Sequence, residues 1–299
     1  MVSAIFPQGR AWGVHVLAVS RDLKSMVTGT RSKNILDRIV EARRESVAHR
    51  KRVLPEVALK IAVEKKIPPP RDFSSAITHD GINIIAELKK SSPSKGLLRE
   101  EYAPAVLASG FESAGGAALS VLTEEDFFHG SLADLKEASR VTKIPILRKD
   151  FIIDPWQVWE TRAAGADSFL LIAAILSDAT LAELLELGRT LEMEPLVEVH
   201  EREELDRVIA AGAKIIGVNN RDLRDFHVHI ETSLALIEMI PDGCIAVSES
   251  GLRTHEDIDR LRRAGFDAFL IGEHLMKEAD PGSALRALRG NPVAEKTHH

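Results

Sequence analysis

Apolar residues recur along the chain in two different patterns. From Ile35 to about Lys66 they recur every three or four positions with charged residues between them, which is the spacing of an amphipathic helix. We interpret this segment as two helices that end at the proline-rich stretch IPPPRDF, because consecutive prolines lack amide donors and favour an extended backbone. The later part of the chain carries short continuous apolar runs instead, which are typical of buried strands.

Eight such runs lie between Asn83 and Gly272: NIIAEL, AALSVL, IPILR, DSFLLIA, EPLVEV, KIIGV, CIAVS and DAFLI. The segments between them are long enough for crossover helices, and several are amphipathic, such as LAELLELGRTLEM. A glycine shortly before a run, as in AAGADSFLLI and AAGAKIIGV, is typical of a helix that ends just before a strand. Strands that alternate with helices predict a parallel sheet.

Eight parallel strands form either an open doubly wound sheet or a closed barrel. No GxGxxG motif follows the first run, which weakens the dinucleotide-binding version of the open sheet. We therefore favour an α/β fold, a (β/α)8 TIM barrel with extra N-terminal helices. We expect a single barrel domain over residues 31–290, an N-terminal extension at 1–30 and a polar C-terminal tail at 291–299.

Composition limits the classes of partner. The formal net charge is −6 and 44% of the residues are hydrophobic, as in an ordinary globular protein. There is no basic block for nucleic acid to bind, and no apolar run approaches the roughly 20 residues of a membrane span, so we expect neither partner. The single cysteine, Cys244, leaves no disulfide framework within this sequence, and we expect a cytoplasmic protein.

Polar residues stand at the carboxyl ends of six runs, where a barrel of this type carries its chemistry. They are Glu87 and Lys89, Lys149, Glu198, Asn219 and Arg221, and the sequences SESG and IGE after the seventh and eighth runs. Singly, each has an ordinary explanation: Lys149 as a solvated ion pair, for example, and Glu198 as a helix cap. Together they predict a functional site, because gathering carboxylates and lysines at one face costs desolvation and repulsion.

The last two loops indicate an anionic ligand. They place Ser250, Gly251 and Gly272 where barrels of this type often bind phosphate through backbone amides, although the glycines have the alternative role of permitting turns. A metal site at His227 and His229 is disfavoured, since no zinc-like spacing supports it.

With these residues in hand, the chain resembles the indole-3-glycerol-phosphate synthase family of tryptophan biosynthesis over roughly residues 33–290. The resemblance is carried by the ordered motifs IIAELKKSSPSKG, SVLTEEDFF, GSLADL, PILRKDF, LVEVH, GVNNRDL, VSESGL and LIGEHLM. It implies that 1-(2-carboxyphenylamino)-1-deoxyribulose 5-phosphate is closed to indole-3-glycerol phosphate with loss of CO2 and water, without metal or organic cofactor. The implied partner is this phosphorylated small molecule, and association with other tryptophan-pathway enzymes is a further expectation.

The resemblance also implies roles. Lys149 matches the general acid of the family, and Lys89 a residue that holds the substrate carboxylate or phosphate. Glu87 and Glu198 match a base and partners of the lysines, and Asn219 a residue that orients the substrate. The substrate- or phosphate-binding positions are Ser92, Arg221, Ser250, Gly251, Gly272 and Glu273.

Two alternatives stay open at this point. One is another phosphate-binding barrel enzyme, such as a sugar-phosphate isomerase of the same pathway, although such an enzyme should lack the combination of Glu-x-Lys and Lys-Asp-Phe. The other is a non-catalytic module that binds a phosphorylated metabolite.

Overall fold

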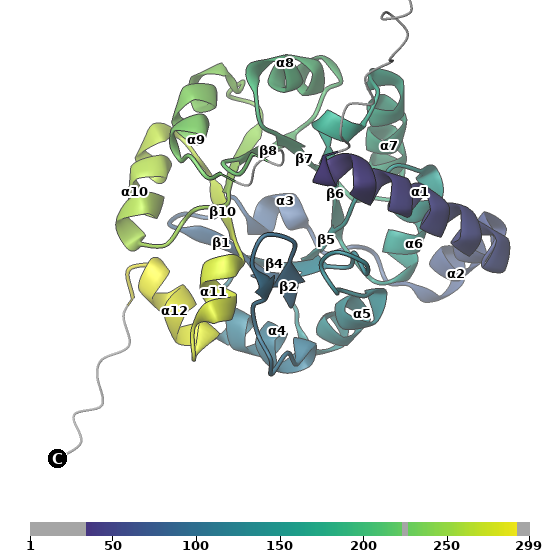
Figure 1. Cartoon of the computed structure of the whole chain (residues 1–299), viewed down its shortest axis with the longest axis horizontal. Coiled ribbons are helices and arrows are strands. Elements are labelled where there is room, and N and C mark those ends of the chain that lie inside the picture. The colour runs from purple at the N-terminus through teal and green to yellow at the C-terminus, as the bar shows by residue number, and fades with distance from the viewer. Residues whose placement is uncertain (1–33, 223–226, 292–299) are drawn as a thin grey trace, which may run out of the picture. The chain divides into compact units, whose positions relative to one another are not determined.

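Eight parallel strands close into a barrel in the computed structural model, which describes residues 34–222 and 227–291 (Figure 1). Their order around the barrel is β1-β10-β9-β8-β7-β6-β5-β4, so the first strand pairs with the last. Each strand falls on one of the predicted runs, and the (β/α)8 TIM barrel is confirmed. The strands are β1 (Asn83–Leu88), β4 (Ala118–Leu122), β5 (Ile146–Lys149), β6 (Ser168–Ile172), β7 (Leu196–Val199), β8 (Ile215–Asn219), β9 (Ile245–Glu249) and β10 (Ala268–Ile271).

Helices follow the strands and surround the barrel (Figure 1). Ser131, Ser177 and Thr254 fix the start of three of them, because each hydroxyl accepts a hydrogen bond from the amide three residues further on. No helix in the described ranges is long and apolar enough to cross a membrane. The helices are α4 (Pro104–Ser113), α5 (Leu132–Val141), α6 (Pro155–Ala163), η1 (Ala173–Ile175), α7 (Asp178–Thr190), α8 (Arg202–Ala210), α9 (Glu231–Leu236), η2 (Ile237–Met239), α10 (His255–Ala264), α11 (Glu273–Lys277) and α12 (Pro281–Leu288).

Alternate strand residues face opposite sides of the barrel wall. In β7, Val197 belongs to the cluster that packs against the helices, whereas Leu196 belongs to the cluster that fills the barrel. Ile85 of β1 lies in the same inner cluster. Since side chains two positions apart share a face, Glu198 and Glu87 also point inward, at the carboxyl end of the barrel.

A short helix, α3 (Phe73–Ala76), closes the amino-terminal end of the barrel. Phe73 and Ile77 are buried in the inner cluster, and Asp72 caps the helix by accepting a hydrogen bond from the Ser75 amide at 2.9 Å. In Figure 1 this helix lies within the ring of strands. The sequence did not predict it, because one helical turn is too short for a periodic pattern.

The two predicted N-terminal helices are α1 (Ile35–Val53) and α2 (Glu56–Lys66). Helix α1 packs at the carboxyl end of the barrel, where Ile39 joins the inner cluster. Its Arg43 lies 3.1 Å from Glu124 and 3.3 Å from Asp150, which follow β4 and β5. All three side chains are at most 2% exposed, so this helix contributes a buried positive charge to both carboxylates, and Asp150 also pairs with Arg148 of β5 at 2.9 Å.

Candidate active site

A cavity of about 350 Å³ opens at the carboxyl ends of the strands. It is the place where the barrel architecture puts chemistry, and the structure brings every predicted site residue to it. The predicted residues that line the cavity are Glu87, Lys89, Ser92, Lys149, Glu198, Asn219, Arg221, Ser250, Gly251, Gly272 and Glu273. His227 and His229 do not line it, and the described residues contain no cluster of side chains suited to a metal ion.

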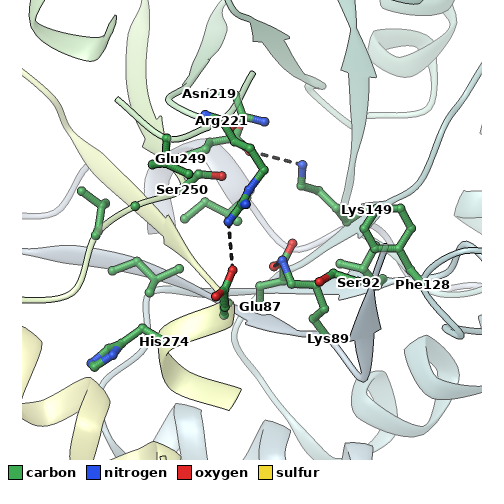
Figure 2. A pocket seen from close by; sticks show the side chains of 18 of the residues that line it. Glu87, Lys89, Ser92, Phe128, Lys149, Asn219, Arg221, Glu249, Ser250 and His274 are labelled. Carbon is green, nitrogen blue, oxygen red and sulfur yellow. Dashed lines mark hydrogen bonds and ion pairs between the residues drawn. The ribbon is translucent and has the colours of Figure 1, made fainter. Parts of the chain in front are cut away.

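Lys149 lies between two carboxylates. Its Nζ is 2.8 Å from Glu198 Oε2 and 3.3 Å from Glu249 Oε2. Burial alone would lower the pKa of Lys149, but the carboxylates of Glu198, Glu249 and Glu87 outweigh burial and raise this pKa above its ordinary value. The ammonium group is therefore charged at neutral pH, and Figure 2 shows it directed into the cavity.

Glu198 is held in its ionised form. Burial alone would raise the pKa of Glu198, but Lys149 and His200 lower it to about 2. His200 Nε2 lies 3.4 Å from Glu198 Oε1, and His200 Nδ1 lies 3.3 Å from Glu204 Oε2. The imidazole thus links the cavity to helix α8, and although burial opposes it, Glu204 and Glu198 raise the pKa of His200 above its usual value.

Glu249, at the end of β9, is a site residue that the sequence reasoning missed. It is 1% exposed, and neither of its carboxylate oxygens makes a hydrogen bond within residues 34–222 and 227–291. Burial and the charge of Glu198 raise the pKa of Glu249 to about 7, although Lys149 opposes this. Glu249 is therefore able to exchange a proton near neutral pH.

Two glycines make room for the inward-pointing carboxylates. A Cβ atom at Gly217 of β8 would collide with Glu249, and a Cβ atom at Gly272 would collide with Glu87. Glu87 is buried and forms an ion pair with Lys89, with 2.7 Å between the carboxylate and the ammonium. The absence of side chains at these two positions is thus a requirement of the site.

The loops after β8, β9 and β10 form the end of the cavity predicted to bind phosphate. Ser250 and Gly251 both have positive φ angles, 67° and 84°, which for serine is an uncommon and strained conformation. Arg221 reaches across the same end (Figure 2), and its guanidinium lies 2.9 Å from the Glu273 carboxylate. Backbone strain at such a loop is typical of sites that bind ligands through their main chain.

The β1 side of the cavity is closed by a hairpin. The segment predicted as a loop contains two short antiparallel strands, β2 (Ser91–Ser92) and β3 (Gly96–Leu97). The Ser91 hydroxyl donates a hydrogen bond of 2.8 Å to the carbonyl of Phe128, in the loop after β4. Phe128 and Phe151, with ring centroids 6.1 Å apart, give this side of the cavity an aromatic wall that sequence reasoning did not identify.

Comparisons with known proteins show the family to which this chain belongs. The family model described as indole-3-glycerol phosphate synthase matches residues 36–288. The indole-3-glycerol phosphate synthase of Carboxydothermus hydrogenoformans is 44% identical over 260 residues, which covers 85% of this chain and 98% of that protein. The synthase of Campylobacter jejuni strain RM1221 is 46% identical over 256 residues, or 85% of this chain and 99% of the relative. The chain belongs to the indole-3-glycerol phosphate synthase family.

More distant solved structures share the barrel fold. 3-Hexulose-6-phosphate synthase from Salmonella typhimurium superposes with a TM-score of 0.57 at 12% identity, over 70% of this chain and 97% of that one. A mandelate oxidase mutant superposes with a TM-score of 0.55 at 17% identity, over 80% of this chain and 83% of that one. These similarities show the fold alone. Membership of the indole-3-glycerol phosphate synthase family disfavours both alternatives left open by the sequence, the sugar-phosphate isomerase and the non-catalytic module.

The sequence contains a pattern that identifies Glu249 as an inward-pointing residue. The seventh run was ended at Ser248, yet Val247 faces the barrel interior, so period-two alternation directs Glu249 inward as well. That its carboxylate has a perturbed pKa depends on neighbours from other strands, which no sequence window contains.

Proposed function

We propose that this protein is an indole-3-glycerol phosphate synthase in which Lys149 is the general acid of ring closure. The observation that carries the assignment of roles is the position of Lys149, charged and mostly buried between Glu198 and Glu249 in the wall of the cavity. In ring closure an aromatic carbon attacks the ketone carbon of the substrate, and the ketone oxygen needs a proton as its negative charge develops. The Lys149 ammonium supplies that proton.

The carboxylates on either side of Lys149 have different tasks. Glu198, with a pKa near 2, stays ionised and stabilises the charged ammonium. Glu249, with a pKa near 7, returns a proton to Lys149 after it has donated its own. Two carboxyl groups with pKa values pushed apart by their surroundings are a recurrent arrangement in acid–base catalysis.

The second pair, Glu87 and Lys89, serves the dehydration that follows decarboxylation. Loss of the hydroxyl group as water needs an acid, and formation of the aromatic pyrrole ring needs a base for the remaining ring proton. An ammonium and a carboxylate 2.7 Å apart at the same strand end provide both. Lys89 also holds an anionic group of the substrate, its carboxylate or its phosphate.

The remaining predicted residues bind and orient the substrate. The phosphate binds the main chain at Ser250, Gly251 and Gly272, with Arg221 as a cationic partner. Ser92 and Asn219 orient the sugar part, and the aromatic wall described above receives the carboxyphenyl ring. These assignments rest on position in the cavity.

A cytoplasmic location, one catalytic domain over residues 31–290 and association with other tryptophan-pathway enzymes remain proposals. They fit an enzyme whose substrate and product are phosphorylated intermediates. Co-purification of the pathway's other enzymes with the tagged chain is the test for association.

The decisive experiment compares the wild type with Lys149→Ala on enzymatically prepared substrate, with indole fluorescence as the readout. Lys136→Ala is the matched control, because Lys136 is exposed on helix α5. We expect turnover in the wild type and the control, and a loss of at least about a hundredfold in kcat in Lys149→Ala. Circular dichroism confirms that each variant is folded. A folded wild type that forms no indole product contradicts the synthase assignment, and an active Lys149→Ala variant moves the acid elsewhere.

A further inference from the structure

At the end of the cavity predicted to bind phosphate, Arg221 and Lys277 form ion pairs with a carboxylate of the protein itself, that of Glu273. Glu273 Oε2 lies 2.9 Å from the Arg221 guanidinium, and Glu273 Oε1 lies 2.6 Å from Lys277 Nζ. Each oxygen of this one carboxylate therefore has a cationic partner. Figure 2 shows the Arg221 side chain extended across this end of the cavity.

The Glu273 carboxylate is ionised at neutral pH. Burial alone would raise the pKa of Glu273, but Lys277, Arg221 and Lys89 outweigh burial and lower it. The side chain is 19% exposed and lines the cavity, so its charge faces the space in which a ligand binds.

A phosphate group that binds at this end must meet that charge. Gly272, whose amide is a predicted phosphate donor, directly precedes Glu273 in the chain, and Arg221 is the predicted cationic partner of the phosphate. Two anions within reach of one guanidinium repel each other and divide its hydrogen-bond donors. The predicted substrate- or phosphate-binding position Glu273 therefore carries a charge that opposes a phosphate at this end of the cavity.

We propose that Glu273 is an internal competitor of the substrate phosphate for Arg221. Without substrate, the Glu273 carboxylate pairs with the Arg221 guanidinium. When the substrate phosphate binds, it displaces this carboxylate from the guanidinium. Glu273 thereby weakens phosphate binding and favours release of the phosphorylated product. The inference rests on the proposed function, because it assumes that the phosphate binds at this end of the cavity.

Calorimetric titration with glycerol 3-phosphate, which matches the phosphate end of the product, tests the competition without turnover. We expect Glu273→Gln to bind this probe roughly fivefold to tenfold more tightly than the wild type, about 1 to 1.4 kcal/mol, because the competing charge is gone. Glu183→Gln is the control: it removes a charge of the same kind from an exposed position on α7 that does not line the cavity, and its Kd should equal that of the wild type. An unchanged or larger Kd for glycerol 3-phosphate in Glu273→Gln overturns the proposal. Glu273 would then have no effect on phosphate binding, or would favour it by holding Arg221 in place.

A crystal structure of the wild type with glycerol 3-phosphate provides a second, independent readout. We expect the Glu273 carboxylate and the Arg221 guanidinium to be more than about 4 Å apart in that complex. An intact pair beside a bound phosphate contradicts displacement. The two proposals fail separately: absence of indole product in the wild type rejects the synthase assignment, whereas normal turnover with no tightening in Glu273→Gln rejects only the competition.

Discussion

Glu249 gives a prediction that couples catalysis to stability. Replacement of Glu249 by glutamine keeps the shape of the side chain and removes its ability to exchange a proton. We expect kcat to fall by about 10²- to 10⁴-fold, the usual contribution of a proton-transfer group. The same replacement should stabilise the fold at alkaline pH, because ionised Glu249 is buried and makes no hydrogen bond in the described part of the chain.

The size and sign of the stability change follow from the pKa of Glu249. This pKa is about 7 in the folded protein, against an ordinary value of 4.5. Between these pH values the folded state binds more protons than the unfolded state, so the free energy of unfolding of the wild type falls as pH rises. The interval corresponds to about 3 kcal/mol, and the loss is complete above about pH 7. Glu249→Gln lacks this loss.

Urea unfolding of both proteins at pH 5 and pH 8 measures the difference. We expect the free energies of unfolding to be similar at pH 5, and the variant to be more stable by about 3 kcal/mol at pH 8. Glu238→Gln, at an exposed position in η2, is the control and should show no pH-dependent difference. A stability difference between Glu249→Gln and the wild type that is the same at both pH values would refute the reasoning, because Glu249 would then have the same pKa folded and unfolded.

Three further substitutions test the packing around the charges. Gly217→Ala places a methyl group against Glu249, so kcat should fall by about tenfold or more while circular dichroism and substrate KM change little, which steady-state kinetics would show. Gly272→Ala makes the corresponding clash with Glu87, but in a loop predicted to bind phosphate, so here we expect a rise in KM together with the loss of kcat. Arg43→Met removes the α1 cation from Glu124 and Asp150, of which Asp150 keeps its ion pair with Arg148, and urea unfolding at pH 7 should show a loss of about 3 kcal/mol.

The strands were predictable because their physical requirements are local. A parallel strand covered on both faces appears as a continuous apolar run. After its first residue, Asn83, the first strand departs from that pattern only where Glu87 enters the cavity. The polar residues at the strand ends were predictable for the same reason, since each breaks a run at its carboxyl end.

Other features depend on contacts between distant parts of the chain. Phe73 and Ile77 belong to the core through the barrel that surrounds them, and their own segment is too short to show a period. Arg43 looked like one of many charged residues of an amphipathic helix, yet its partner Glu124 stands 81 residues later. The charge state of a buried group such as Glu249 is likewise set by neighbours from other strands.

The ion pairs of Arg43 also limit how far this barrel can be divided into independent units. A TIM barrel can be regarded as eight interchangeable strand–helix units, yet the buried carboxylate after β4 takes its ion pair from a guanidinium of a helix outside all eight units. A shortened chain that began after α2 would keep every strand but would leave the buried Glu124 without its ion pair to Arg43, whereas Asp150 would keep its ion pair with Arg148. For design by fragment recombination or circular permutation, the smallest transferable piece is therefore the barrel together with α1.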